Sequence, residues 1–200
     1  PGWQELEAAW EAGRIGSRAC MAGQVALLDC SSEELAAHVA GIAIDPHFKS
    51  FVDAVHASGA RLTIASDGLG EVIAAVLARA GLAHLPLLAS RLVQSGARQW
   101  ALEFPHARAQ CAAGSATCKC AALRRDPRRP ALLVGDGASD FCAAAHADLT
   151  LAKSRLREHC DVHGIPHRSI GDFADALCAW RELSADTPLE AAAAPAGGGV

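Results

Sequence analysis

The sequence has no stretch that approaches the roughly 20 consecutive apolar residues of a membrane-spanning helix, although 51% of its 200 residues are hydrophobic. It also has no positively charged start followed by an apolar run, which is the pattern of a secretion signal. Basic residues are not in excess, because 18 Lys and Arg stand against 22 Asp and Glu, a net charge of −4. We therefore expect a cytoplasmic protein that binds neither nucleic acid nor a membrane surface.

The one basic run, residues 124–129, is broken by Pro127, and we interpret it as a solvated loop. Eight cysteines are present, but they fall in helix-like and strand-like segments rather than in a short secreted scaffold. We therefore expect reduced thiols instead of a disulfide framework. The length suits one domain, or a core with a small appended module.

Residues 1–44 have helical periodicity and no convincing strand. Ser31, with Glu34 three residues later, has the pattern of a capping box at the start of a helix. We therefore predict that this segment forms a small, all-helical module.

Residues 45–182 alternate between helix-like and strand-like patterns. Asp45 before Pro46 predicts a helix start, and Gly59 predicts its end; its apolar face would be Phe48, Phe51, Val52 and Val55. Predicted strands cover 61–66, 131–134 and 147–152, with a weaker candidate at 85–88, a hairpin from 91–93 and 100–104, and a closing helix at 173–180. This order predicts an α/β core with a doubly wound parallel sheet, followed by a disordered, low-complexity tail over 183–200.

Two predicted strands end in distinctive polar residues, and ligands of open α/β sheets bind at the carboxyl ends of strands. The first strand ends in Ser66, Asp67 and Gly68. A hydroxyl beside free backbone N–H groups at such a turn can hold a phosphate oxygen. Ser and Gly are also common turn formers, so this segment alone has a purely structural reading.

The second strand leads into Gly-Asp136-Gly-Ala-Ser-Asp140. Two carboxylates four residues apart at the start of a helix lie about one turn from each other on the same side. One can bind a hard cation and the other can hold a lysine; the simpler alternative is a turn with an Asp N-cap. Lys119, between the two strand ends along the chain, is the candidate lysine, although a lone lysine is usually solvent-facing.

The chain resembles haloacid dehalogenase phosphatases. Motifs two, three and four of that family are similar, in this order, to Ser66, Lys119 and the Asp136–Asp140 segment. The helical module ahead of them resembles the cap of the phosphoserine phosphatase-like branch. A narrower resemblance, to the MtnX-like branch of methionine salvage, is carried by residues 15–18, 62–68, 104–106 and 118–120. The substrate of that branch is 2-hydroxy-3-keto-5-methylthiopentenyl-1-phosphate. The resemblance covers about residues 1–180.

The resemblance implies a Mg²⁺-dependent phosphomonoesterase that acts on a small phosphorylated metabolite through an aspartyl-phosphate. It implies that Ser66, with its neighbours Asp67 and Gly68, binds the phosphoryl oxygens and that Lys119 neutralises charge on the nucleophile and the phosphate. Asp136 would ligate Mg²⁺, and Asp140 would orient Lys119 or hold a metal-bound water.

The sequence departs from the family because no D-x-D motif, which carries the nucleophile and the general acid, occurs in it. In the family this motif lies on a central strand just before the cap. We therefore expect that the first strand is missing from this chain, that the two strands on either side of its place have open edges, and that the chain alone does not turn over. The alternative is a non-catalytic phosphate-binding relative.

Two cap residues bear on the substrate. Phosphoserine phosphatases carry a cap arginine for the substrate carboxylate, and Gln24 aligns with that position here. A neutral amide would not pair with a carboxylate as a guanidinium does, so phosphoserine is the less favoured alternative substrate. Arg18 is a candidate substrate contact, or else a surface arginine.

Two further clusters have ligand-type side chains. His106, Cys111, Cys118 and Cys120 are of types that suit zinc, but the C-x-C spacing with one histidine fits a loop of free or buried thiols equally well. A second group, with no accompanying carboxylate pattern, is interpreted as surface or loop residues: His159, His163 and His167.

Overall fold

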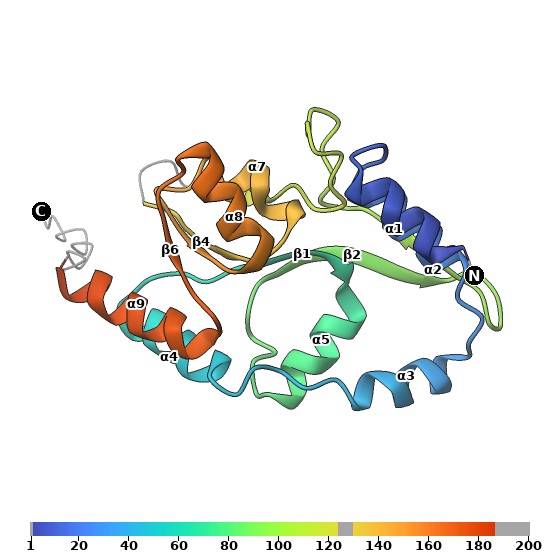
Figure 1. The fold of residues 1–200 in the computed structure, drawn as a ribbon. Coiled ribbons are helices and arrows are strands. Elements are labelled where there is room, and N and C mark those ends of the chain that lie inside the picture. The colour runs from blue at the N-terminus through green and yellow to red at the C-terminus, as the bar shows by residue number, and fades with distance from the viewer. Residues whose placement is uncertain (1, 124–129, 187–200) are drawn as a thin grey trace, which may run out of the picture.

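A computed structural model describes residues 2–123 and 130–186, which form an α/β fold (Figure 1). Its helices are α1 (Trp3–Glu11), α2 (Ser17–Ala26), α3 (Ser32–Ala40), α4 (Phe48–Ala57), α5 (Gly70–Arg79), α6 (Lys119–Leu123), α7 (Phe141–Ala144), α8 (Ser154–His163) and α9 (Phe173–Asp186), with a 3-10 turn η1 (Ala138–Asp140). Its strands are β1 (Ile64–Leu69), β2 (Leu87–Gln94), β3 (Trp100–Glu103), β4 (Leu132–Gly135), β5 (Leu149–Ala152) and β6 (His167–Ser169).

The strands form two three-stranded sheets rather than one continuous parallel sheet. In the first, β1 is parallel to β2 and β2 is antiparallel to β3, as the predicted hairpin requires. In the second, β4, β5 and β6 are all parallel. Since β1 and β4 each stand at the end of their sheet's order, each has one edge without a strand partner in the described part of the chain.

One hydrophobic core joins the two sheets. Helices lie on both sides of the strands in Figure 1, with α4, α5 and α9 on one side and α1, α2, α7 and α8 on the other. The cluster between α4, α5 and α9 includes Phe51 and Val52, and it is contacted both by Ile64 of β1 and by Val134 of β4. Burial of each large apolar side chain contributes about 1.5–3 kcal/mol, so this shared cluster fixes the two sheets relative to each other.

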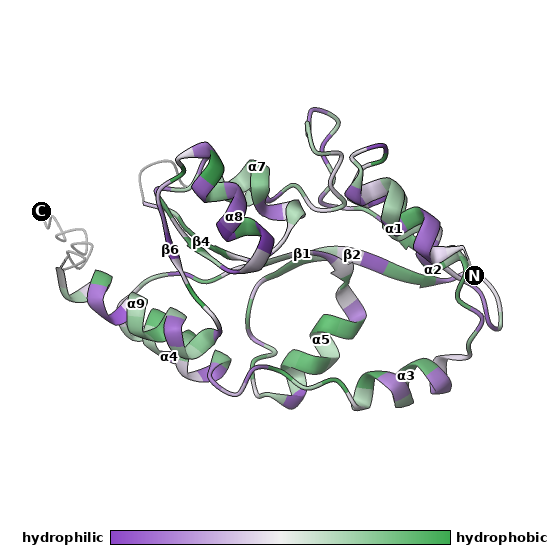
Figure 2. Cartoon of the chain, in the orientation of Figure 1, coloured by the Kyte–Doolittle hydropathy of each residue, from purple (hydrophilic) through white to green (hydrophobic). Residues whose placement is uncertain are grey.

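The hydropathy of the helices follows their position (Figure 2). α5, whose sequence is GEVIAAVLAR, is mostly hydrophobic and packs on β1 and β2. α8, whose sequence is SRLREHCDVH, is mostly hydrophilic and buries only Leu156 and Cys160. No helix in residues 2–123 and 130–186 has the length and apolar character to cross a membrane.

Residues 2–44 contain three helices, as predicted, and the capping box is confirmed. The Ser31 hydroxyl accepts a hydrogen bond from the Glu34 N–H, and the Glu34 carboxylate accepts one from the Ser31 N–H. The predicted N-cap at Asp45 is wrong by two residues, because α4 begins at Phe48 and its N-cap is His47. The Asp45 carboxylate instead accepts from the His47 N–H (2.8 Å) and from the Phe173 N–H at the start of α9 (3.2 Å).

Other predicted boundaries also shift. The candidates at 85–88 and 91–93 are parts of one strand, β2. Three elements, α6, α8 and β6, were not predicted. α9 continues to Asp186, so the residues from 183 to 186 are helical and not part of a tail. The rest of the predicted tail and the basic run at 124–129 lie outside the described residues.

Candidate active site

The polar turn after β4 is organised around the Asp140 carboxylate, which is 6% exposed. Its Oδ2 accepts from the backbone N–H groups of Asp136 and Gly137, each at 3.2 Å. The chain passes so close at Gly135 that a Cβ there would lie 2.6 Å from the same oxygen. Glycine is therefore required at 135 to leave room for the carboxylate that closes the turn.

Lys119 opens α6 and reaches across to this turn. Its Nζ donates to Asp140 Oδ1 at 2.5 Å and to the Ser139 hydroxyl at 2.8 Å. The lysine side chain is 11% exposed. A charged pair so shielded from water has a strong mutual attraction and a geometry fixed by several hydrogen bonds, so the ammonium group is held in one place.

The segment Ser66–Gly68 lies inside β1 and not at the end of a strand, which corrects the expectation. The register with β2 shifts between Ala65 and Leu69, so the three residues bulge out of the pairing. The Ser66 hydroxyl accepts from the Gly68 N–H at 3.0 Å. That N–H is thus engaged within the segment, which leaves the serine O–H as the group that can donate to a ligand.

The Asp67 carboxylate connects three parts of the chain. It accepts a short hydrogen bond from the hydroxyl of Ser17, at the start of α2, and another from the Thr117 N–H at 2.8 Å. The Asp67 carbonyl accepts from the buried Ser90 hydroxyl of β2 at 2.9 Å. Asp67 therefore holds the cap helix and the 115–117 loop against β1. Sequence reasoning missed Ser17 and Thr117, because only the folded chain brings them to β1.

The three predicted motifs converge through the loop that precedes Lys119. The Thr117 hydroxyl donates to the Ser66 carbonyl at 2.7 Å, and Lys119 follows two residues later with its bonds to the β4 turn. Ser66, Lys119 and Asp140 are therefore linked by a short series of contacts across the gap between β1 and β4. The arrangement connects the Ser66 segment inside β1 to the Lys119 ammonium group, and a hydroxyl and a cation are groups that can bind a phosphoryl oxygen.

Asp136 differs from Asp140 in its surroundings. Its side chain is exposed, and no residue of the described ranges forms a hydrogen bond or ion pair with its carboxylate. A hard cation such as Mg²⁺ prefers oxygen ligands of this kind and keeps several waters, so Asp136 fits a metal ligand. Both oxygens of Asp140 are engaged, which favours the orienting role for Asp140 over direct metal ligation.

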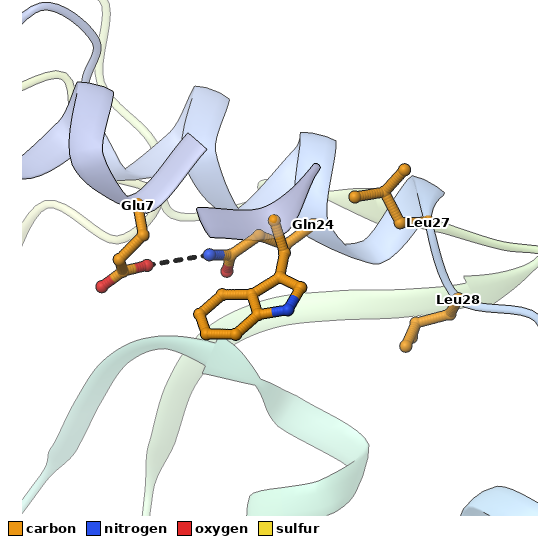
Figure 3. A pocket seen from close by; sticks show the side chains of 5 residues that line it. Glu7, Gln24, Leu27 and Leu28 are labelled. Atoms are coloured by element: carbon orange, nitrogen blue, oxygen red, sulfur yellow. Dashed lines mark hydrogen bonds between the residues drawn. The ribbon is translucent and has the colours of Figure 1, made fainter. Parts of the chain in front are cut away.

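Neither cap residue joins this cluster directly. Arg18 is exposed, and its backbone N–H donates to the Gly114 carbonyl at 3.3 Å. Gln24 donates from its amide to the Glu7 carboxylate at 2.8 Å. The side chains of Gln24 and Glu7 line a hollow of about 530 Å³ between α1 and α2, together with Trp3, Leu27 and Leu28 (Figure 3).

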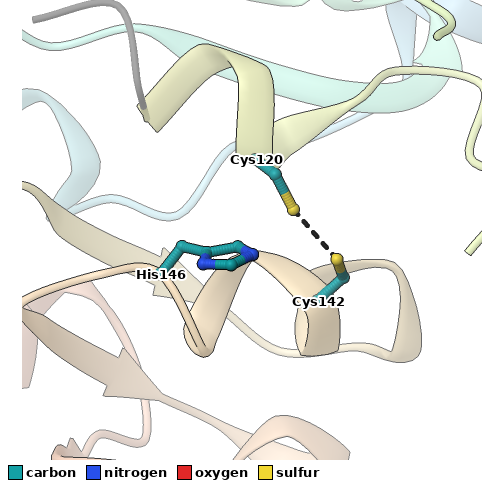
Figure 4. Close-up of side chains that lie close together, drawn as sticks. All are labelled: Cys120, Cys142 and His146. Atoms are coloured by element: carbon teal, nitrogen blue, oxygen red, sulfur yellow. Dashed lines mark hydrogen bonds between the residues drawn. The ribbon is translucent and has the colours of Figure 1, made fainter. Parts of the chain in front are cut away.

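The cysteines group differently from the expected cluster. Of the expected residues, only Cys120 belongs to a set of three metal-type ligands in the described part of the chain, and its companions are Cys142 and His146 (Figure 4). The Cys120 and Cys142 sulfurs are 3.0 Å apart. Burial, and then the hydrogen bond with Cys142, raise the pKa of Cys120 to about 12, so it is a neutral thiol in the metal-free protein at neutral pH.

His159 and His163, which were interpreted as surface or loop residues, both lie on α8. His159 stacks on Phe141 with ring centroids 3.9 Å apart, and His163 lies 4.1 Å beyond it. Burial, and then the proximity of His163, lower the pKa of His159. This stack joins α7 to α8 and is structural. His167 lies on β6, with Nε2 3.4 Å from the Asp161 carboxylate.

The chain is similar in sequence to proteins of one known family. Residues 3–145 match the family model described as haloacid dehalogenase-like hydrolase. Among curated proteins, the chain is 30% identical over 137 residues to a 2-hydroxy-3-keto-5-methylthiopentenyl-1-phosphate phosphatase of Brevibacillus brevis, covering 67% of this chain and 61% of the relative. A protein of the same name from Bacillus pumilus is 29% identical over 131 residues, covering 64% and 56%. The chain thus spans about three fifths of the length of these relatives.

A solved structure has a similar fold. It is a phosphoserine phosphatase from T. onnurineus in complex with NDSB-201, with a TM-score of 0.63 over 89% of this chain and 80% of that one. The sequence identity is 15%, so this likeness shows the fold alone.

Proposed function

We propose that this chain, which belongs to the haloacid dehalogenase-like hydrolase family, carries the phosphate- and metal-binding half of a Mg²⁺-dependent phosphomonoesterase. The observation that carries the proposal is the position of Lys119. Its ammonium group is fixed by Ser139 and Asp140 and linked through Thr117 to Ser66. A shielded cation that is linked through one loop to the segment carrying the Ser66 hydroxyl is suited to bind the oxygens of a phosphoryl group.

Each residue has a distinct role in this proposal. The Ser66 O–H donates to one phosphoryl oxygen, and Lys119 neutralises the charge that develops during transfer. Asp140 keeps Lys119 in place, and Asp136 holds Mg²⁺, which would supply further charge neutralisation when bound. The chemistry is thus mainly positioning and electrostatics, and it requires a separate nucleophile.

We place that nucleophile on a strand between β1 and β4. Both strands have an open edge in the described residues, and an apolar hollow of about 320 Å³ beside Ile64 of β1 is lined by side chains of α4, α5 and α9. A strand there would satisfy the backbone groups of both edges. Its aspartate would attack phosphorus, the ester P–O bond would break, and a second aspartate would protonate the leaving oxygen. Water would then hydrolyse the aspartyl-phosphate.

The coding sequence upstream of residue 1 provides the first test. A strand-like apolar run that ends in D-x-D supports the enzyme, whereas a different residue in place of the first aspartate supports a non-catalytic, phosphate-binding relative.

Kinetics on the protein that contains such a strand provide the second test. Asp136→Asn should abolish Mg²⁺-dependent hydrolysis of phosphomonoesters, and Lys119→Met should lower kcat on the order of 10²–10³-fold. Asp53→Asn, which changes an exposed carboxylate on α4, is the matched control and should leave kcat unchanged. Full activity in Asp136→Asn would refute the assignment.

For the substrate, we propose an enol phosphate of the kind named for the curated relatives rather than phosphoserine. Ser17, which binds Asp67, lies at the start of α2. Gln24 lies seven residues further along the same helix, about 10 Å from Ser17. The hollow at Gln24 combines apolar side chains with the Glu7 carboxylate, which would repel the carboxylate of phosphoserine. We expect a higher kcat/KM for 2-hydroxy-3-keto-5-methylthiopentenyl-1-phosphate; a preference for phosphoserine would overturn this choice. Gln24→Ala should change KM more than kcat.

A further inference from the structure

We propose that Cys120, Cys142 and His146 form a second metal site, which binds a thiophilic divalent cation such as Zn²⁺. One sulfur or ring-nitrogen atom from each residue lies within 4.8 Å of the others. Figure 4 shows the two sulfurs facing each other, with the imidazole ring beside them. Two thiols and an imidazole are the soft and borderline ligands that zinc prefers, whereas Mg²⁺ prefers oxygen.

The local structure explains why these three residues meet. Cys142 lies on α7, and His146 follows four residues later, just beyond the end of that helix. A separation of four residues places two side chains on the same side of a helical turn. Cys120 approaches from α6, which packs on α7. The two cysteines are half-buried and His146 is exposed, so an ion can enter from the histidine side and keep a water as its fourth ligand.

The distance between the sulfurs must increase when the metal binds. They are 3.0 Å apart, whereas two sulfurs on a tetrahedral zinc, each about 2.3 Å from the metal, are roughly 3.8 Å apart. Rotation about the Cα–Cβ bonds of the two cysteines would move the sulfurs apart. The competing outcome, a Cys120–Cys142 disulfide, would need the sulfurs to approach to about 2.05 Å.

The site would affect the candidate active site through the helices that it joins. Cys120 is adjacent to Lys119 in the sequence, and Cys142 lies two residues after Asp140. A metal that cross-links α6 to α7 would therefore hold the two elements that carry the Lys119–Asp140 pair. It would act on the position of Lys119 and would not contact the phosphoryl group. The proposal does not depend on the phosphatase activity.

Cobalt substitution tests the site directly. The purified chain is reduced, freed of metal and titrated with Co²⁺. Excess Mg²⁺ is present throughout, so that sites made of oxygen ligands are already occupied. We expect a sulfur-to-cobalt charge-transfer band in the near ultraviolet that saturates at one equivalent and is displaced by one equivalent of Zn²⁺. Cys142→Ser and His146→Ala should each weaken Zn²⁺ binding at least about tenfold; His146 is exposed, so its replacement should leave the fold intact.

Two cysteine variants serve as controls. Cys178→Ser removes an exposed thiol of α9, and Cys118→Ser removes a thiol of the cluster first expected from the sequence; both should retain the band and the affinity. The proposal is overturned if no charge-transfer band appears, if the band survives in both Cys142→Ser and His146→Ala, or if Cys118→Ser abolishes it. It is also overturned if the chain purified without reductant contains no metal and has lost two hydrogens to a Cys120–Cys142 disulfide.

Discussion

The turn after β4 and the bulge in β1 both contribute to the candidate site, but they are held in different ways. The β4 turn is closed within six residues, because Asp140 accepts the N–H groups of Asp136 and Gly137. The β1 bulge is held by residues far away in the sequence, since Ser17 and Thr117 each lie 50 positions from Asp67. One half of the site is thus defined locally, and the other depends on the packing of the cap and of the 115–117 loop.

The difference has a thermodynamic consequence. A turn that satisfies its own polar groups needs few long-range contacts to form. Formation of the bulge, in contrast, requires three separate segments to become ordered, and their loss of conformational entropy opposes it. We therefore expect changes in the β4 turn to damage the Lys119 pair directly, and changes around Asp67 to loosen the contact between cap and core.

The largest effect is expected for Asp140→Ala. This variant leaves the shielded Lys119 ammonium without its carboxylate, and loss of one partner of a buried pair costs about 3–5 kcal/mol. Urea unfolding followed by tryptophan fluorescence measures the change. Glu182→Ala removes a carboxylate from an exposed pair with Arg168 and should cost under about 1 kcal/mol. Equal losses in the two variants would contradict the account of the β4 turn.

Gly135→Ala should have the next largest effect. The added methyl group would lie 2.6 Å from Asp140 Oδ2 and 2.7 Å from its Cγ, and such overpacking costs about 1–3 kcal/mol. Gly137→Ala is the matched control, because a Cβ there meets nothing within 4 Å. If the two alanine variants have the same free energy of unfolding, the close approach at Gly135 has no energetic importance.

A smaller effect is expected for Ser17→Ala. It removes one hydrogen bond to the Asp67 carboxylate, which retains the Thr117 N–H, so the cost is about 1–2 kcal/mol. Ser50→Ala, at an exposed position on α4, should change the stability little. Faster proteolysis between cap and core in Ser17→Ala, but not in Ser50→Ala, would confirm the cap contact. An unchanged free energy of unfolding and unchanged proteolysis would argue against it.

The smallest effect is expected for Asp45→Asn, away from both strand ends. The hydrogen bond from the His47 N–H, with a further one from the Phe173 N–H, lowers the pKa of Asp45. Because the pKa is lower in the folded state, this group stabilises the protein above its unfolded pKa, and the contribution is lost as the pH falls through the folded value. Asp45→Asn should cost at most about 1 kcal/mol at pH 7, and less at pH 3. A loss that does not depend on pH would show that the charge is unimportant.

The same contrast explains what the sequence could predict. The Gly-Asp-Gly turn with Asp140 four residues after Asp136 has a local pattern, and its placement at the end of an apolar strand was predictable. The capping box at Ser31 was predictable for the same reason. The role of Asp67 was not, because its partners Ser17 and Thr117 are identified only by tertiary packing. The strand β1 also extends past Ser66, since a bulge permits pairing to resume at Leu69 beyond residues that locally indicate a turn.

The Cys120, Cys142 and His146 cluster shows a similar limit. The sequence pointed to neighbours of Cys120 along the chain, whereas its companions are Cys142 on α7 and His146 just beyond that helix, 22 and 26 residues later. Only the C-x3-H spacing of Cys142 and His146 was visible locally, and spacing alone does not identify the third ligand.

The central claim, that Ser66 and Lys119 bind one phosphoryl group beside a metal on Asp136, is tested most directly by phosphate binding. Isothermal titration of inorganic phosphate into the Mg²⁺-loaded chain should give one site that is lost without Mg²⁺. Lys119→Met and Ser66→Ala should each weaken it at least about tenfold, which is 1.4 kcal/mol, and Arg18→Ala should leave it unchanged. Phosphate affinity that is the same in Lys119→Met as in the parent chain would contradict the account.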